Sequence, residues 1–212
     1  MMRALSALGD TALLAPASVV LLLYLAALRR WVDARAFAAT LVLGLGATLL
    51  AKLLFKACGG SISLLDVNSP SGHASFAALF YGPLAVMVGA GRPRWQAALA
   101  WIPAALLVLA IGASRIALDA HSWPEVVLGW LIGLAGIGAF AWLLRTPGRR
   151  PLSPVPLAIG LGLAIVLVDG RHFPAEHYIG RLARYANASL DVCTGAGTRV
   201  TELNLGVRIT SR

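Results

Sequence analysis

The sequence predicts an all-α integral membrane protein, a bundle of six transmembrane helices followed by a short extension. Of the 212 residues, 58% are hydrophobic and 13% are charged, a balance too apolar for an ordinary soluble domain. A helix needs about 20 apolar residues to cross a bilayer, and segments of roughly that length recur along the chain. The six predicted spans are residues 11–28, 36–57, 74–90, 97–113, 123–144 and 152–168. We therefore expect a transmembrane domain at residues 1–168 and an extension at residues 169–212.

Basic residues give these spans an orientation. The short loops after the first, third and fifth spans hold one acid, Asp33, and the arginines Arg29, Arg30, Arg35, Arg92, Arg94, Arg145, Arg149 and Arg150. By the positive-inside rule these loops are cytoplasmic, so the amino terminus, the other loops and the extension face outward. The net charge of +9 is thus spread over tight turns, which argues against a nucleic-acid-binding face. Positive charge is heavier after the first span than before it, the reverse of a secretory signal, so we expect this helix to be retained.

Caps and small residues mark how individual spans begin and pack. A loop of small and polar residues follows the second span, and Ser69 or Ser71 is placed to cap the third. Ser122 is placed to cap the fifth span. Gly129 and Gly133 lie one turn apart within that span, and such residues allow helix backbones to approach closely in lipid.

The extension differs from the rest of the chain. Residues 174–189 predict a helix with an apolar face made of Tyr178, Ile179, Leu182, Tyr185 and Ala186. It would lie on the outer membrane surface or pack on the bundle. Alternating apolar residues at 203–209 predict a small β-hairpin. Cys58 and Cys193 both fall on the outward side, as a disulfide or as two free thiols.

Residues suited to binding an anion gather where the outward ends of three spans are predicted to meet. An anion is held by backbone N–H groups at a helix start, by small residues that allow close approach, and by cations. Ser71 and Gly72 open the third span, and Arg115 closes the fourth with a guanidinium that matches phosphate oxygens. Lys52 lies near the outer end of the second span, where it adds a second cation or only snorkels to the interface.

Two histidines share this predicted surface. His73 follows Gly72 directly, and His121 precedes the fifth span. Both side chains titrate near neutral pH, so one can act as a nucleophile and the other as a general acid. The sequence therefore predicts a site that binds and cleaves a phosphate ester at one membrane surface.

The same residues resemble two signatures of a known family. Pro70-Ser71-Gly72-His73 is similar to the second signature of the type 2 phosphatidic acid phosphatase superfamily, which also includes vanadium haloperoxidases. Ser114-Arg115, then His121 after five residues, then Glu125 after three more, resembles the third signature. The resemblance covers roughly residues 45–145 and agrees with the predicted order of spans.

This resemblance implies a role for each matched residue. His121 would attack phosphorus to form a phosphohistidine, which water then hydrolyses, and His73 would protonate the leaving oxygen. Glu125 would orient the ring of His121. The phosphoryl oxygens would be bound by Lys52, Ser71, Gly72 and Arg115. The resemblance implies that no metal or other cofactor is needed, because fixed donors and cations stabilise the transition state.

The sequence departs from the family pattern in two places. Glu125 stands where the third signature has aspartate, although its longer carboxylate can still accept a hydrogen bond from His121. The first signature is a lysine followed after six residues by Arg-Pro, whereas Gly59-Gly60 occupies those positions after Lys52. One expected guanidinium is therefore missing. Either phosphate binding at the site is weaker without it, or Lys56, Arg171 or Arg181 supplies the missing positive charge.

Several of these residues also have purely structural interpretations. Ser71 would cap a helix in any membrane protein. Arg115 is spaced to form an i,i+4 ion pair with Asp119. Ser122 and Glu125 match a capping box, a role that can coexist with catalysis. The remaining histidines, His172 and His177, lack such motifs and are expected at the surface of the extension.

Together these features predict a membrane lipid phosphatase, and the resemblance to the family implies undecaprenyl diphosphate as the first expected substrate. Phosphatidylglycerol phosphate, phosphatidic acid and lipid A phosphates follow closely. Two alternatives are a lipid phosphotransferase and, because the Arg-Pro pair is absent, a non-catalytic lipid-binding relative. The 16 arginines against two lysines suggest a high-GC bacterium, and hence a cytoplasmic-membrane enzyme whose site faces the periplasm. The sequence makes no prediction about the oligomeric state.

Overall fold

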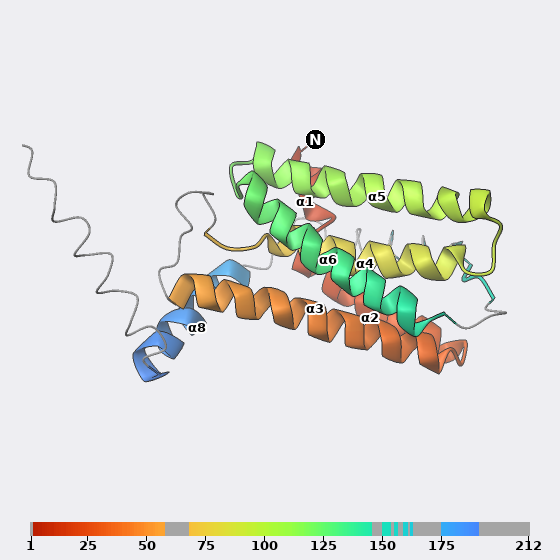
Figure 1. The fold of residues 1–212 in the computed structure, drawn as a ribbon, viewed down its shortest axis with the longest axis horizontal. Helices are drawn as coiled ribbons and strands as arrows, with labels where there is room; N and C mark the ends of the chain where they lie inside the picture. Colours follow the sequence, from red (N-terminus) through yellow and green to blue (C-terminus); the bar gives the residue numbers. More distant parts are fainter. Residues whose placement is uncertain are drawn as a thin grey trace, which may run out of the picture.

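The fold was determined as a computed structural model that describes residues 2–57, 68–145, 150–153, 155–156, 159–160, 162 and 175–190. Within these ranges every regular element is a helix, as the sequence predicts (Figure 1). The helices are α1 (Met2–Ala7), α2 (Thr11–Ala27), α3 (Trp31–Ala57), α4 (Gly72–Gly89), α5 (Arg94–Ala117), α6 (Trp123–Leu143) and α8 (Ala175–Leu190).

Four of these helices, α3 to α6, are long and apolar enough to cross a membrane. They correspond to the predicted spans at 36–57, 74–90, 97–113 and 123–144. The first predicted span coincides with α2, an apolar helix of 17 residues that is shorter than the other four. Most of the sixth, at 152–168, lies outside the described residues. The chain is therefore a multi-pass membrane protein, with four of its six predicted spans present at full length.

Two helices, α3 and α5, extend past the apolar segments that predict them. α5 runs from Arg94 to Ala117 and carries Arg115 in its last turn, where a cation interacts favourably with the helix dipole. α3 begins at Trp31 and carries Asp33 in its first turn. The Asp33 carboxylate accepts a 2.5 Å hydrogen bond from Arg30 Nε. Charged residues at helix ends therefore remain helical although they lie beyond the apolar core of each span.

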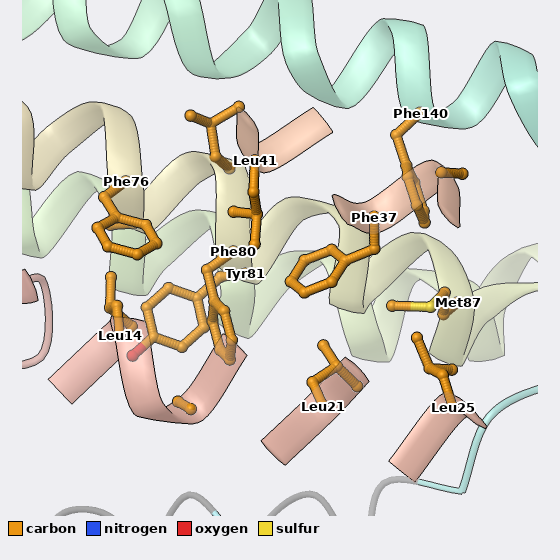
Figure 2. Close-up of a cluster of buried hydrophobic side chains, with 14 of the residues drawn as sticks. Leu14, Leu21, Leu25, Phe37, Leu41, Phe76, Phe80, Tyr81, Met87 and Phe140 are labelled. Carbon is orange, nitrogen blue, oxygen red and sulfur yellow. The ribbon is translucent and has the colours of Figure 1, made fainter. Parts of the chain in front are cut away.

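The α4 helix is the centre of the bundle, because α2, α3, α5 and α6 all pack against it. Its ring side chains interlock with neighbouring helices (Figure 2). Phe80 packs edge to face on Phe37 of α3, with ring centroids 6.1 Å apart. Within α4, the rings of Phe80 and Tyr81 also pack edge to face, with centroids 5.1 Å apart. Lipid tails are as apolar as these side chains, so close packing rather than the hydrophobic effect holds the helices together.

Two glycines let α6 approach α4 very closely, as the sequence predicts. A Cβ atom on Gly129 would lie 2.6 Å from the carbonyl oxygen of Ser71, and one on Gly133 would overlap the Cβ of Ala78. The Ser71 N–H donates a 2.9 Å hydrogen bond to the carbonyl oxygen of Glu125. The start of α4 and the start of α6 are therefore fixed against each other, which matters because both carry predicted site residues.

We expect Gly129→Ala to destabilise the protein by about 1–3 kcal/mol, because the added methyl group forces these two helix starts apart. Thermal unfolding in detergent measures the effect. Gly138→Ala is the matched control, because a Cβ atom on Gly138 in the same helix meets nothing within 4 Å. Equal unfolding temperatures for the two variants would show that the close approach at Gly129 is not required.

The described part of the extension is α8, which confirms the helix expected at residues 174–189. It packs against α3 and buries the small residue Ala183, whereas Tyr178, Leu182 and Tyr185 stay exposed. The helix therefore contacts the bundle and still presents large apolar side chains outward. The predicted β-hairpin at 203–209, Cys58 and Cys193 lie outside the described residues.

The amino-terminal helix α1 is not predicted by the sequence. It packs against α5, and residues 8–10 connect it to α2. Asp10 caps α2, since its Oδ1 atom accepts a 2.8 Å hydrogen bond from the N–H of Ala12. Figure 1 shows α1 near the end of the bundle where α5 finishes and α6 begins.

Candidate active site

The two signature segments meet through the Glu125 carboxylate. The Oε1 atom of Glu125 accepts hydrogen bonds from the N–H groups of Asn68 and Ser69, at 2.7 and 2.8 Å. Its Oε2 atom lies 2.7 Å from Nδ1 of His121 and accepts a 3.2 Å bond from the N–H of Ser122. The side chain is buried, so these donors replace the water that the carboxylate gives up. One carboxylate therefore joins the loop before α4 to the histidine before α6.

This contact sets the chemical state of His121. An ionised carboxylate only accepts hydrogen bonds, so Nδ1 of His121 donates to Glu125. In the neutral ring, Nε2 then carries the lone pair and is free of the carboxylate. Ser122 and Glu125 also form the predicted capping box of α6. The capping role and the orienting contact are thus made by the same side chain.

The pKa of His121 is lowered below the ordinary value of 6.5. Burial is the main cause, because it disfavours the charged ring, and the positive charges of Lys52 and Arg115 act in the same direction. The hydrogen bond from His121 to Glu125 opposes them. The imidazole is therefore neutral at neutral pH, which is the state a nitrogen nucleophile requires.

Lys52 and Gly72 bring a cation to the start of α4. The Lys52 side chain is 2% exposed, so it does not snorkel to water. A Cβ atom on Gly72 would lie 3.5 Å from Lys52 Cε and 4.0 Å from Nζ. Ser71 caps the helix, with Oγ 3.5 Å from the N–H of Ala74. A lysine buried beside a helix start in a membrane protein is typical of functional sites.

Arg115 reaches the same end of the bundle from α5. Its Nη1 atom donates a 2.7 Å hydrogen bond to Ser6 of α1. Asp119 lies in the turn after α5, with a φ of 52°, and none of the ion pairs described between placed residues joins it to Arg115. Arg115 is also close enough to affect the charge of His121. The guanidinium therefore lies between the amino-terminal segment and the surroundings of His121.

His73 faces a residue that carries no sequence motif. Its Nε2 atom lies 3.7 Å from Oδ2 of Asp10. Sequence reasoning missed Asp10 and Ser6 because both precede the first predicted span. Asp10 stands before an apolar run, which is an N-cap pattern, but nothing in that pattern places it beside His73. The amino-terminal segment thus contacts two of the predicted site residues, Arg115 and His73.

Comparisons with known proteins show which family the chain belongs to. A family model for the PAP2 superfamily matches residues 54–149, a range that contains Ser71, Gly72, His73, Arg115, His121 and Glu125. A protein of Klebsiella pneumoniae, described as an uncharacterized 22.5 kDa protein in the cps region, is 31% identical over 192 residues. The alignment covers 84% of this chain and 88% of that protein. The chain belongs to the PAP2 superfamily. No solved structure matches it.

Membership in the PAP2 superfamily indicates phosphatase activity on phosphate esters. The matched range begins two residues after Lys52, so it leaves out the lysine of the first signature. That signature is also the one whose Arg-Pro pair is missing from this chain. Of the suggested replacements, Arg181 is exposed on α8, whereas Arg171 and the Lys56 side chain lie outside the described residues. Among the described side chains, no group of three or more His, Cys, Asp or Glu residues is arranged to hold a metal ion.

Proposed function

We propose that this PAP2 superfamily member is a lipid phosphate phosphatase that works through a phosphohistidine at His121. The observation that carries the proposal is the Glu125 carboxylate, which bonds both to His121 Nδ1 and to the loop that opens α4. A nucleophile whose ring is fixed by a buried acid, beside two cations and a helix start, is an arrangement suited to transferring a phosphoryl group.

In the first step, Nε2 of His121 attacks phosphorus, so that a P–N bond forms as the P–O ester bond breaks. The electron pair of that bond leaves with the ester oxygen, which takes a proton from His73. Lys52, Arg115 and the N–H groups at the start of α4 bind the three remaining phosphoryl oxygens. Their fixed positive charge and dipoles stabilise the negative charge of the transition state.

In the second step, water attacks the phosphohistidine. Neutral His73 takes a proton from the water, the P–N bond breaks, and its electron pair returns to Nε2 of His121. Inorganic phosphate leaves, and both histidines regain their starting states. His73 therefore acts as an acid in the first step and as a base in the second, and His121 is first the nucleophile and then the leaving group.

The position of the site favours a lipid substrate. The site residues lie at the ends of helices long enough to cross a membrane, so a bound phosphate would sit at the bilayer surface with its lipid tail among them. We propose undecaprenyl diphosphate first, then phosphatidylglycerol phosphate, phosphatidic acid and lipid A phosphates. The basic loops opposite the site argue for a bacterial cytoplasmic membrane with the site facing the periplasm.

Phosphate release from a panel of these four lipids, by the purified protein in detergent, tests the proposal. We expect free phosphate from at least one lipid, in amounts equal to the dephosphorylated product. If phosphate appears on an added acceptor lipid and not in solution, the protein is a phosphotransferase. If lipids bind but no phosphorylated His121 forms with any of them, the protein is a non-catalytic lipid-binding relative.

A further inference from the structure

The amino-terminal segment, residues 6–10, is held against the candidate active site from two sides. Arg115 of α5 donates a 2.7 Å hydrogen bond to the hydroxyl of Ser6, which is itself buried. Tyr81 of α4 donates a 3.0 Å bond from its hydroxyl to the carbonyl oxygen of Leu8. Figure 2 shows the Tyr81 ring among the core side chains, with its hydroxyl end toward the helix that carries Leu14. A segment held in this way has a fixed position relative to α4 and α5.

Gly9 allows this segment to lie directly on His73. A Cβ atom on Gly9 would be 3.3 Å from the carbonyl oxygen of His73 and 2.6 Å from the Ile111 side chain. The next residue, Asp10, places Oδ2 3.7 Å from Nε2 of His73. Because Oδ1 of Asp10 accepts the N–H of Ala12 in the cap of α2, the orientation of the carboxylate is fixed. Asp10 as a whole is only 9% exposed.

We propose that Asp10 is a positioning residue for His73 and holds it ready to donate a proton to the leaving group. This inference rests on the proposed phosphatase reaction and extends it to a segment outside the matched signatures. The carboxylate lies within ion-pair distance of the ring, at 3.7 Å, and attracts the protonated imidazole that the first step consumes. The other charged side chains described at the site cannot do this. Lys52 and Arg115 are cations, and the Glu125 carboxylate is bonded to His121.

Two substitutions separate this role from the capping of α2. Asp10→Asn keeps an excellent N-cap but removes the negative charge, whereas Asp10→Glu keeps the charge but is a poor cap. If Asp10 is only a cap, Asp10→Glu is the damaging change. If Asp10 positions His73, Asp10→Asn is the damaging change. Thermal unfolding in detergent reports the cap, and turnover reports the role at His73.

The readout is turnover of two substrates that differ in how much they need an acid. The diacylglycerol oxygen of phosphatidic acid must be protonated as it leaves, whereas p-nitrophenyl phosphate has a leaving group that departs as a stable anion. Only the first step differs between the two substrates, so the rate is taken from release of the leaving group in a single turnover. We expect Asp10→Asn to lower this rate about tenfold or more with phosphatidic acid, and less than about threefold with p-nitrophenyl phosphate. His73→Ala should show the same pattern with a larger amplitude, and Asp10→Glu should keep the wild-type ratio of the two rates.

Asp33→Asn is the matched control, because it removes a buried carboxylate that pairs with Arg30 near the start of α3. It should lower stability without changing the ratio of the two rates. A wild-type ratio in Asp10→Asn, or an equal loss on both substrates, would overturn the assignment of Asp10. If the wild-type protein cleaves neither substrate and nothing in the lipid panel, the phosphatase proposal fails first and the role of Asp10 fails with it.

Discussion

Substituting His121 by alanine should lower phosphate release by about four orders of magnitude or more, because the attacking nitrogen is lost. The loss should appear in kcat, since Lys52 and Arg115 still bind the phosphate group. Phosphate release from the best lipid of the panel measures it, with thermal unfolding to show that the variant is folded. The experiment discriminates between a nucleophile and a ring that only completes the packing before α6.

His177→Ala serves as the comparison, because the sequence places His177 in the extension and gives it no motif. It should turn over substrate as the wild-type protein does. His73→Ala should also lose most of its activity on lipid phosphates, as expected for a general acid. Turnover close to the wild-type rate in either His121→Ala or His73→Ala would remove the two-histidine mechanism.

The second large effect is expected for Glu125→Gln. The glutamate accepts from donors at Asn68, Ser69, His121 and Ser122, whereas a glutamine has one acceptor oxygen and turns an NH2 group toward the remaining donors. We expect kcat to fall by about 10²–10⁴-fold, because the ring of His121 loses its orientation and its negative partner. Stability should fall by about 1–3 kcal/mol for each buried donor left unpaired.

The same variant has a defined effect on the pH profile. The hydrogen bond to Glu125 raises the pKa of His121, in opposition to burial and the nearby cations, so its loss lowers that pKa further. The neutral nucleophile then persists to lower pH, and the acidic limb of kcat/KM should move toward more acidic pH. In the wild-type protein this limb should already lie below pH 6.5. A shift of the limb toward neutral pH in Glu125→Gln would contradict the assignment.

Glu125→Asp tests why glutamate occupies this position. One methylene shorter, the aspartate side chain can keep its contact with His121 or with the N–H groups of the loop, but not both at their present distances. We therefore expect activity between that of the wild-type protein and that of Glu125→Gln. Activity equal to wild type would show that the bridge between loop and ring is not needed.

The sequence predicted the parts of the site that depend on local patterns. The caps at Ser71 and Ser122 and the order of the spans place His73 and His121 at helix starts, and antiparallel neighbours bring those starts to one end of the bundle. The close approach at Gly129 follows from the small residue alone. These features could be inferred because each depends on neighbouring residues or on the alternating direction of membrane helices.

The amino-terminal part of the site could not be predicted. Ser6 contacts Arg115 across 109 positions in the sequence, and Asp10 reaches His73 from a different helix. A short helix such as α1 is too brief to show a clear hydrophobic period. The pattern at Asp10 predicts a helix cap, which it is, and the second use of its carboxylate is visible only once α2 and α4 are packed together.

The burial of Lys52 also came only from the three-dimensional arrangement. In sequence it is a lysine near the end of an apolar span, which is equally typical of a side chain that reaches out to water. In the structure Gly72 leaves room for it beside the start of α4. The contacts of Glu125 were likewise predicted only in part. The capping box follows from the sequence, whereas the hydrogen bonds to Asn68 and Ser69 depend on the three-dimensional fold.

The central claim is that His121 receives the phosphoryl group, and locating that group on the protein tests it most directly. Turnover of the best lipid substrate would be stopped in alkali, which preserves phosphohistidine, and the protein would be mapped by mass spectrometry. We expect one phosphoryl group, on His121, that is absent from His121→Ala and disappears as free phosphate is released. A phosphoryl group on another residue, or full turnover with none on His121, would contradict the mechanism.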